Sequence, residues 1–306
     1  MPLIEPLKFR KSGSTVVAPA EMEPGDQIPG AYISDIAGSN LLINGDMRIN
    51  QRAFAGGALT ASAFGYDRWF ADTGGANVSV SAAGVITHAS GTICQAIEAP
   101  RGVFGASITI SVGDLSGGNL NVSVGGVAGT ITAGTGRRYV SIAAPGSSGT
   151  GNLIVKISPA TASVTYREIA VVRGGDMAGF DYQPAAFLLI QCQRFYEKSY
   201  PLNVAAGTVT DAGQSAFFLY GVSSPNFAAG YTTDFKVSKR GTPAVTLYSP
   251  NSGAAGKMYS AGTNADVNGV AGSPGISGFF PNSGTIAATD NLNIRWHWVA
   301  DAEITS

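Results

Sequence analysis

The sequence predicts an all-β chain with an extended N-terminal arm, an antiparallel jelly-roll sandwich, one linking helix and a second, C-terminal β-sandwich domain. Three observations support this fold class. Apolar residues alternate with small or polar residues along most of the chain, which is the period of a half-buried strand. Turn residues separate these segments at intervals of about eight to twelve residues, as in sandwiches and barrels. A single segment carries apolar residues at helical spacing.

The composition favours a structural, self-associating protein. Only 13% of the 306 residues are charged, against about 25% in a typical soluble domain. We therefore expect copies of the chain to cover part of one another's surface in a homo-oligomer. The net charge of -1 argues against bulk attraction to nucleic acid or to an anionic membrane. No apolar window approaches the length of a transmembrane helix, so we expect no membrane insertion.

Residues 1–38 are expected to form an extended arm. They show little periodicity and contain Pro2, Pro6, Pro19, Pro24 and Pro29. Such a segment cannot build a core of its own, so we expect it to be ordered on a partner chain.

Residues 39–183 are expected to form the jelly-roll sandwich. Their alternating segments lie at 77–90, 106–114, 120–126, 137–145, 151–159 and 164–174, with glycine-rich turns between them. Cys94 and Cys192 lie 98 positions apart and form no metal motif, so buried unpaired thiols are expected. The first residues do not resemble a signal peptide, and we expect folding in a reducing cytoplasm.

The linking helix is expected at 184–201, between two prolines that suit its start and its end. Its apolar residues recur at intervals of three and four, and could pack on a neighbouring domain or on identical helices: Leu188, Leu189, Cys192, Phe195 and Tyr196. Residues 202–306 return to the alternating pattern, at 214–224, 230–239, 244–253, 275–284 and 292–304. This distal β-domain has long loops rich in glycine, asparagine and serine, which suit the presentation of contacts.

A distinctive stretch opens the sandwich, with NLLINGDMRINQRA at 40–53 and GYDRW at 65–69. Asn40 and Asn44 can close turns through side-chain hydrogen bonds to the backbone, and Gly45 permits a positive φ. We expect charged residues to lock loops and the tryptophan to anchor the core: Arg48, Arg52, Asp67, Arg68 and Trp69. A structural role is favoured over direct ligand binding.

This stretch resembles the first strand of the carbohydrate-binding-module-like jelly rolls of bacteriophage tail fibres and related virion proteins. YREIAVVRGGDMAGFDYQP at 166–184 looks like the strand and exit that close that domain. QCQRFYEKSY at 191–200 resembles the helix leading to a distal β-domain, and VADAEI at 299–304 resembles the end of that domain. The resemblance covers residues 40–200 and, more loosely, the rest of the chain. It implies a homotrimeric tail fibre that is part of the virion.

The sequence shows no arrangement typical of an enzyme, and we expect no catalytic activity, no metal and no cofactor. Its two histidines are His88, expected to be satisfied or solvated on a strand, and His297, between two tryptophans. Carboxylates are scattered, and no long repeat predicts the parallel β-helix of polysaccharide-degrading fibres. The glycine-rich turns lack the lysine or helix of a phosphate site.

Glycan binding is the chemistry that the sequence supports best. In the segment 292–299, Ile294, Trp296 and Trp298 share one strand face, which is expected to be core or subunit interface rather than a sugar platform. Aromatic and polar residues near turns or on the opposite face are the candidate ligand contacts: Phe227, Tyr231, Tyr248, Phe279, Phe280, Arg295 and His297.

The expected function is therefore a non-enzymatic tail fibre. Residues 1–38 would dock on tail or baseplate proteins, and the distal domain would bind a bacterial surface polysaccharide. A head fibre or decoration protein without receptor binding is the alternative, and a polysaccharide-degrading enzyme is a weaker one.

Overall fold

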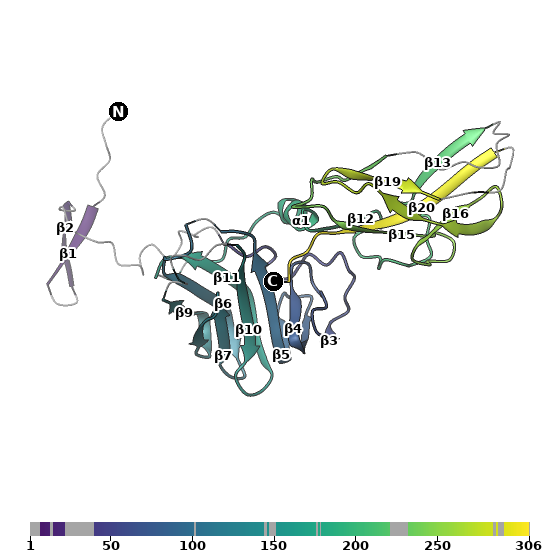
Figure 1. Cartoon of the computed structure of the whole chain (residues 1–306). Coiled ribbons are helices and arrows are strands. Elements are labelled where there is room, and N and C mark those ends of the chain that lie inside the picture. Colours follow the sequence, from purple (N-terminus) through teal and green to yellow (C-terminus); the bar gives the residue numbers. More distant parts are fainter. Residues whose placement is uncertain are drawn as a thin grey trace, which may run out of the picture.

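The computed structural model describes residues 7–12, 15–21, 40–100, 102–143, 146, 151–175, 177, 179–220, 232–283, 286 and 291–305. Over these residues the chain consists mainly of antiparallel strands with one α-helix, which confirms the all-β prediction (Figure 1). The helix is α1 (Ala185–Gln193).

The N-terminal arm contains a hairpin that the sequence did not predict. β1 (Leu7–Ser12) and β2 (Thr15–Glu21) pair antiparallel, with Ser12 opposite Thr15. The remainder of the predicted arm lies outside the described residues.

The central domain is a nearly closed antiparallel sandwich, as predicted. Its strands are β3 (Gly57–Leu59), β4 (Phe70–Val80), β5 (Ile86–Ile97), β6 (Ile108–Ser116), β7 (Leu120–Val124), β8 (Val127–Ile131), β9 (Gly134–Ile142), β10 (Leu153–Pro159) and β11 (Val164–Arg173). β5 joins the two layers, because its first residues pair with β11 and its last residues pair with β10. β7 and β8 continue from β10, whereas β6 and β9 continue from β11.

Burial in the sandwich follows the strand period. Leu153, Val155 and Ile157 of β10 point into the core, while the residues between them are partly exposed. Trp69 is also buried in this core, as predicted, and its Nε1 donates a hydrogen bond to the Asn44 carbonyl at 2.8 Å.

The two asparagines of the opening stretch close its turns, as predicted. Asn44 Nδ2 donates to the carbonyls of Ile49 and Asp67, at 2.9 and 3.0 Å, while its Oδ1 accepts from the Ile49 amide. Positive φ values occur at Asn44 (59°) and Met47 (56°) rather than at Gly45, which corrects that expectation. Gly45 is required for space, since a Cβ there would lie 2.1 Å from the Ile169 carbonyl oxygen.

The linking helix is shorter than the predicted 184–201. α1 ends at Gln193, and residues of its expected last turn form β12 (Tyr196–Lys198), which pairs with the end of β20 (Asn291–Asp301). The spacing that suggested a longer helix at Phe195 and Tyr196 arises because both side chains are buried at the start of the distal domain.

The distal domain is built around β20. The first half of β20 pairs with β13 (Ser215–Tyr220) and β16 (Lys257–Ser260), and its second half with β15 (Ala244–Tyr248) and β12. β17 (Ala265–Asn268) extends this sheet, and a smaller sheet holds β14 (Thr233–Asp234), β18 (Val270–Gly272) and β19 (Gly278–Asn282). Ile294, Trp296 and Trp298 lie in the domain core, so their face is core, as expected.

Candidate functional site

The two β-domains meet at a double connection. The chain enters the distal domain through β12 and leaves it through the neighbouring end of β20, with Tyr196 opposite Asp301. The last described residues then return to the sandwich, beside β4 and β5 (Figure 1). The Ala302 amide donates to the Phe195 carbonyl at 2.7 Å, and Ile304 packs against Phe195 and Ala96. Both ends of the distal domain are therefore fastened to the sandwich.

The opening stretch provides the polar part of this fastening. The Arg68 guanidinium lies over the Phe195 ring, 3.5 Å from its centroid, and forms an ion pair with Glu303. Arg52 lies 3.4 Å from Glu303 and 3.7 Å from Asp67. Burial raises the pKa of Glu303, and the two arginines oppose that rise. The stretch thus holds the distal domain as well as closing its own loops, which extends the predicted structural role.

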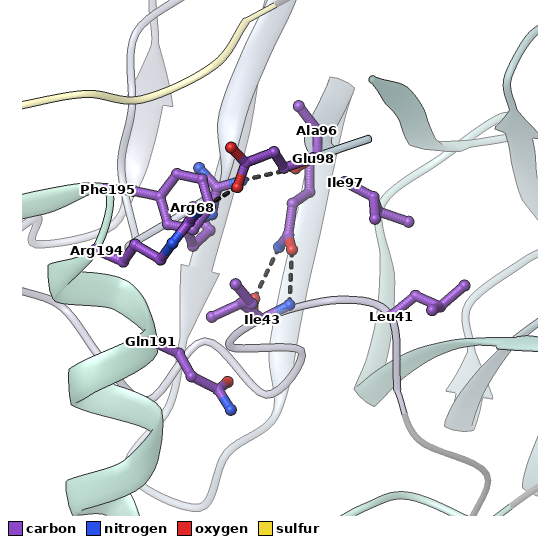
Figure 2. Close-up of a pocket in the computed structure, with 10 residues that line it drawn as sticks. Leu41, Ile43, Arg68, Ala96, Ile97, Glu98, Gln191, Arg194 and Phe195 are labelled. Atoms are coloured by element: carbon purple, nitrogen blue, oxygen red, sulfur yellow. Dashed lines mark hydrogen bonds and ion pairs between the residues drawn. The ribbon is translucent and has the colours of Figure 1, made fainter. Parts of the chain in front are cut away.

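A hollow of about 240 Å³ lies at this junction, beside the end of α1 (Figure 2). Arg194 and Arg240 both pair with Glu98, and Gln95 exchanges two 2.8 Å hydrogen bonds with the Ile43 backbone. Because these polar groups are occupied within the protein, the hollow is part of the joint and offers few free groups to a ligand.

A more polar hollow, of about 250 Å³, lies on the distal domain and includes the predicted residue Arg295. It is lined by Val209, Thr210, Asp211, Pro250, Asn251, Tyr259 and Arg295, and we call it the Arg295 hollow. Arg295 on β20 stands between Ala216 on β13 and Tyr259 on β16. The loop 203–214 and the turn at 249–252 complete the rim. The hollow is therefore lined by one guanidinium, one carboxylate, one amide and one phenol, which belong to Arg295, Asp211, Asn251 and Tyr259.

The turn that supplies Asn251 is fixed by its neighbours. Ser249 Oγ accepts hydrogen bonds from the amides of Asn251 and Ser252, at 3.2 and 3.3 Å, and donates to Asp266 at 2.6 Å. Tyr259 is fixed as well, because its hydroxyl donates to Asn264 Oδ1 at 2.7 Å. The rim is therefore largely preformed on this side.

His297 holds one of the segments that line the Arg295 hollow. Its Nε2 donates to the Thr210 carbonyl at 2.9 Å, and its Nδ1 accepts from the Ser199 hydroxyl at 2.9 Å. The ring stacks on Tyr200 with centroids 3.9 Å apart. Burial lowers the pKa of His297, so the ring is neutral at pH 7. Its place in the structure is that of a support for the loop 203–214.

Two of the other predicted contact residues lie elsewhere in the distal domain. Phe279 is buried in the core against Phe235 and Trp298, whereas Phe280 is exposed. Both line an open hollow of about 380 Å³ near β14 and β19. Tyr248 lies opposite His297 in the register and contacts Tyr200 edge to face. The structure thus groups Tyr248, Arg295 and His297, and separates them from Phe279 and Phe280.

The remaining two predicted contacts, Phe227 and Tyr231, lie outside the described residues. Six of the seven residues that line the Arg295 hollow were not predicted, among them the three whose side chains could contact a ligand through polar or aromatic groups: Asp211, Asn251 and Tyr259. The available signal was the position of each polar or aromatic side chain beside a glycine- or proline-rich turn. That signal is weak, because the same pattern recurs throughout the chain.

The predictions for the two cysteines and for His88 are confirmed. Cys94 and Cys192 are buried and unpaired. His88 is buried, donates from Nε2 to the Gly91 carbonyl and accepts from the Tyr166 hydroxyl. Within the described ranges, no cluster of three histidine, cysteine or acidic residues could hold a metal ion, and no helix is long and apolar enough to cross a membrane.

No family model and no curated protein matches this chain.

Proposed function

We propose that this chain is a structural virion protein, a bacteriophage tail fibre that binds a host surface glycan through its distal domain. Residues 1–38 attach it to the tail tip or baseplate. The observation that carries the proposal is the Arg295 hollow, which gathers hydrogen-bonding side chains and an aromatic ring on a domain fastened to a sandwich. The resemblance of residues 40–53 and 166–184 to tail-fibre jelly rolls supports the same assignment.

The chemistry of the hollow suits a sugar. Saccharide hydroxyl groups both donate and accept hydrogen bonds, and the hollow offers donors at Arg295, acceptors at Asp211 and both at Asn251. The Tyr259 ring supplies an apolar surface with a polar edge, which suits the C–H face of a sugar ring. A shallow site of this kind binds weakly by itself, so several chains must act together to give strong attachment.

Two further features suit a multivalent fibre. The buried joint fixes the direction of the distal domain, which keeps the effective concentration of the next site high. Tyr182, Phe187 and Ile190 present exposed apolar side chains near the start of the helix. Phe187 and Ile190 are three residues apart on α1 and share one face. We propose that this face packs against identical chains in the homotrimer.

Binding of the purified full chain to intact candidate host bacteria tests the proposal. We expect saturable binding that is lost after periodate oxidation of the surface glycans. Arg295→Gln should weaken binding, whereas Arg173→Gln, at an exposed arginine of the sandwich, should leave it unchanged. Binding that survives periodate would contradict glycan recognition. A stable oligomer that binds no candidate host would favour a head fibre or decoration protein, which imaging of particles would locate on the capsid.

The role of the arm is tested separately. Removal of residues 1–38 should leave a folded oligomer that still binds cells but no longer enters particles. Incorporation of the shortened chain into particles would contradict docking through the arm.

A further inference from the structure

We infer that the Arg295 hollow takes a carboxylated sugar, the kind of unit that a uronic acid contributes to a surface polysaccharide. The inference rests on the proposed function, because it assigns the chemical class of the glycan to the same site. It rests on two observations. Arg295 forms no ion pair with a described residue, and polar and aromatic side chains line the hollow beside it.

Arg295 differs from most arginines of the described chain, because seven of them pair with a carboxylate within the protein: Arg48, Arg52, Arg68, Arg137, Arg167, Arg194 and Arg240. Arg295 has no ion pair with any described residue. Its Nε donates to Asn293 Oδ1 at 3.1 Å, and its strand neighbours Ala216 and Tyr259 carry no charge. Among the residues that the structure describes, none bonds to the two terminal nitrogens of Arg295, which are thus available to a ligand.

A free guanidinium that lines a hollow is suited to a carboxylate. Its parallel N–H groups match the two carboxylate oxygens and form charge-assisted hydrogen bonds, which are about twice as strong as neutral ones. Arg295 is held in the middle of the sheet on β20 and is partly buried, so its interactions are screened less than those of an exposed side chain. Burial keeps the neighbouring His297 neutral, so Arg295 is the positive charge among the residues that line the hollow.

The carboxylate of Asp211 determines which other groups the ligand must carry. It lies on the exposed loop 203–214, where water screens its charge more strongly than that of Arg295. Sugar hydroxyl groups can donate to Asp211 and to the Asn251 carbonyl, while the Tyr259 ring contacts the ring face. A carboxylated sugar satisfies all of these groups at once. A cationic amino sugar would satisfy Asp211 but would bring its charge towards Arg295.

The decisive experiment uses the full chain and the polysaccharide extracted from bacteria that it binds. One sample is treated with carbodiimide and borohydride, which reduces each carboxyl group to an alcohol and leaves the sugar rings and their hydroxyl groups intact. A mock-treated sample is the control. We expect at least about tenfold weaker binding after reduction, because the charge-assisted bonds are lost. Equal binding of both samples would overturn the inference while leaving glycan recognition in place.

Substitutions at Arg295 and Asp211 distinguish an anionic sugar from a cationic one. Arg295→Gln should lower the affinity for the mock-treated polymer about tenfold and remove the difference in affinity between the two samples. Arg295→Lys should restore part of that affinity. Asp211→Asn should retain binding and the preference for the unreduced polymer. Loss of binding with Asp211→Asn and not with Arg295→Gln would identify a cationic sugar and overturn the inference. Failure of the wild-type chain to bind either sample would instead overturn the proposed function itself.

Discussion

Arg68 and Glu303 form an ion pair across 235 positions of sequence, and both side chains are buried between the two β-domains. Arg68 belongs to the loop that precedes β4, and Glu303 belongs to the tail that follows β20. The pair shows that the opening stretch of the sandwich also holds the distal domain. The orientation of the Arg295 hollow relative to the sandwich therefore depends on residues far from the hollow itself.

Replacement of Glu303 by alanine is expected to destabilise the protein strongly. Arg68 would be left buried without its partner, a situation that costs about 3–5 kcal/mol. Urea unfolding followed by tryptophan fluorescence measures the change. The matched control is Asp72→Ala, which breaks the more exposed pair with Lys156 and should cost at most about 1 kcal/mol. Equal effects of the two substitutions would contradict a special role for the buried pair.

Removal of residues 302–306 should loosen the joint without unfolding either domain. The Phe195–Ala302 hydrogen bond, the Ile304 packing and the Arg68–Glu303 pair would be lost, whereas β12 and β20 would stay paired. Small-angle scattering should then show a larger maximum dimension, with an unchanged far-ultraviolet circular dichroism spectrum. Identical scattering curves would show that the two strands alone fix the orientation.

His88 is expected to make the protein less stable in acid. Burial lowers its pKa to about 4 from the ordinary 6.5. Between these two values the unfolded chain binds a proton that the folded chain does not, so stability falls as the pH drops from 6.5 to 4. His88 contributes at most about 3 kcal/mol to this loss of folding free energy. Stability measured across this range should fall less steeply for His88→Gln than for wild type, and parallel curves would contradict the assignment.

The two cysteines should be inert in the folded protein. Burial raises the pKa of Cys94 to about 12 and the pKa of Cys192 well above its ordinary value, so neither thiol forms a reactive thiolate at pH 7. Mass spectrometry after incubation with iodoacetamide should show no modification in buffer and two modifications in concentrated urea. Fast labelling of either cysteine in buffer would show that its surroundings open readily.

The exposed face of α1 should affect self-association. Phe187→Ser together with Ile190→Ser removes its two largest exposed apolar groups, and should reduce the oligomer mass measured by light scattering. Val270→Ser is the matched control, because Val270 is equally exposed but lies on the distal domain. Loss of the oligomer in the control alone would move the interface to the distal domain.

The regular parts of the fold could be predicted because their signals are local. The alternation in 292–299 predicted that Ile294, Trp296 and Trp298 face either the core or a subunit interface, and the structure places them in the core. The glycine-rich turns marked the ends of most strands. The end of the helix was harder to predict, since Tyr196 fits both a helix face and a buried strand. Its pairing with Asp301 decides the outcome, and that partner is 105 positions away.

The candidate site was predicted only in part for the same reason. Arg295 was found because it stands on a strand with a recognisable face. Asp211, Asn251 and Tyr259 come from three other segments, and only the sheet brings them to one hollow. The opening stretch was recognised as structural, but its partner Glu303 could not be predicted, because nothing near either residue in sequence indicates the other.

Hydrogen exchange of the full chain, with and without the polysaccharide extracted from a candidate host, tests the proposed recognition most directly. The account predicts that bound polysaccharide slows exchange in the loop 203–214, in the turn at 249–252 and in β16, while the sandwich is unaffected. Protection confined to the sandwich, or to the segments around Phe280, would contradict recognition at the Arg295 hollow.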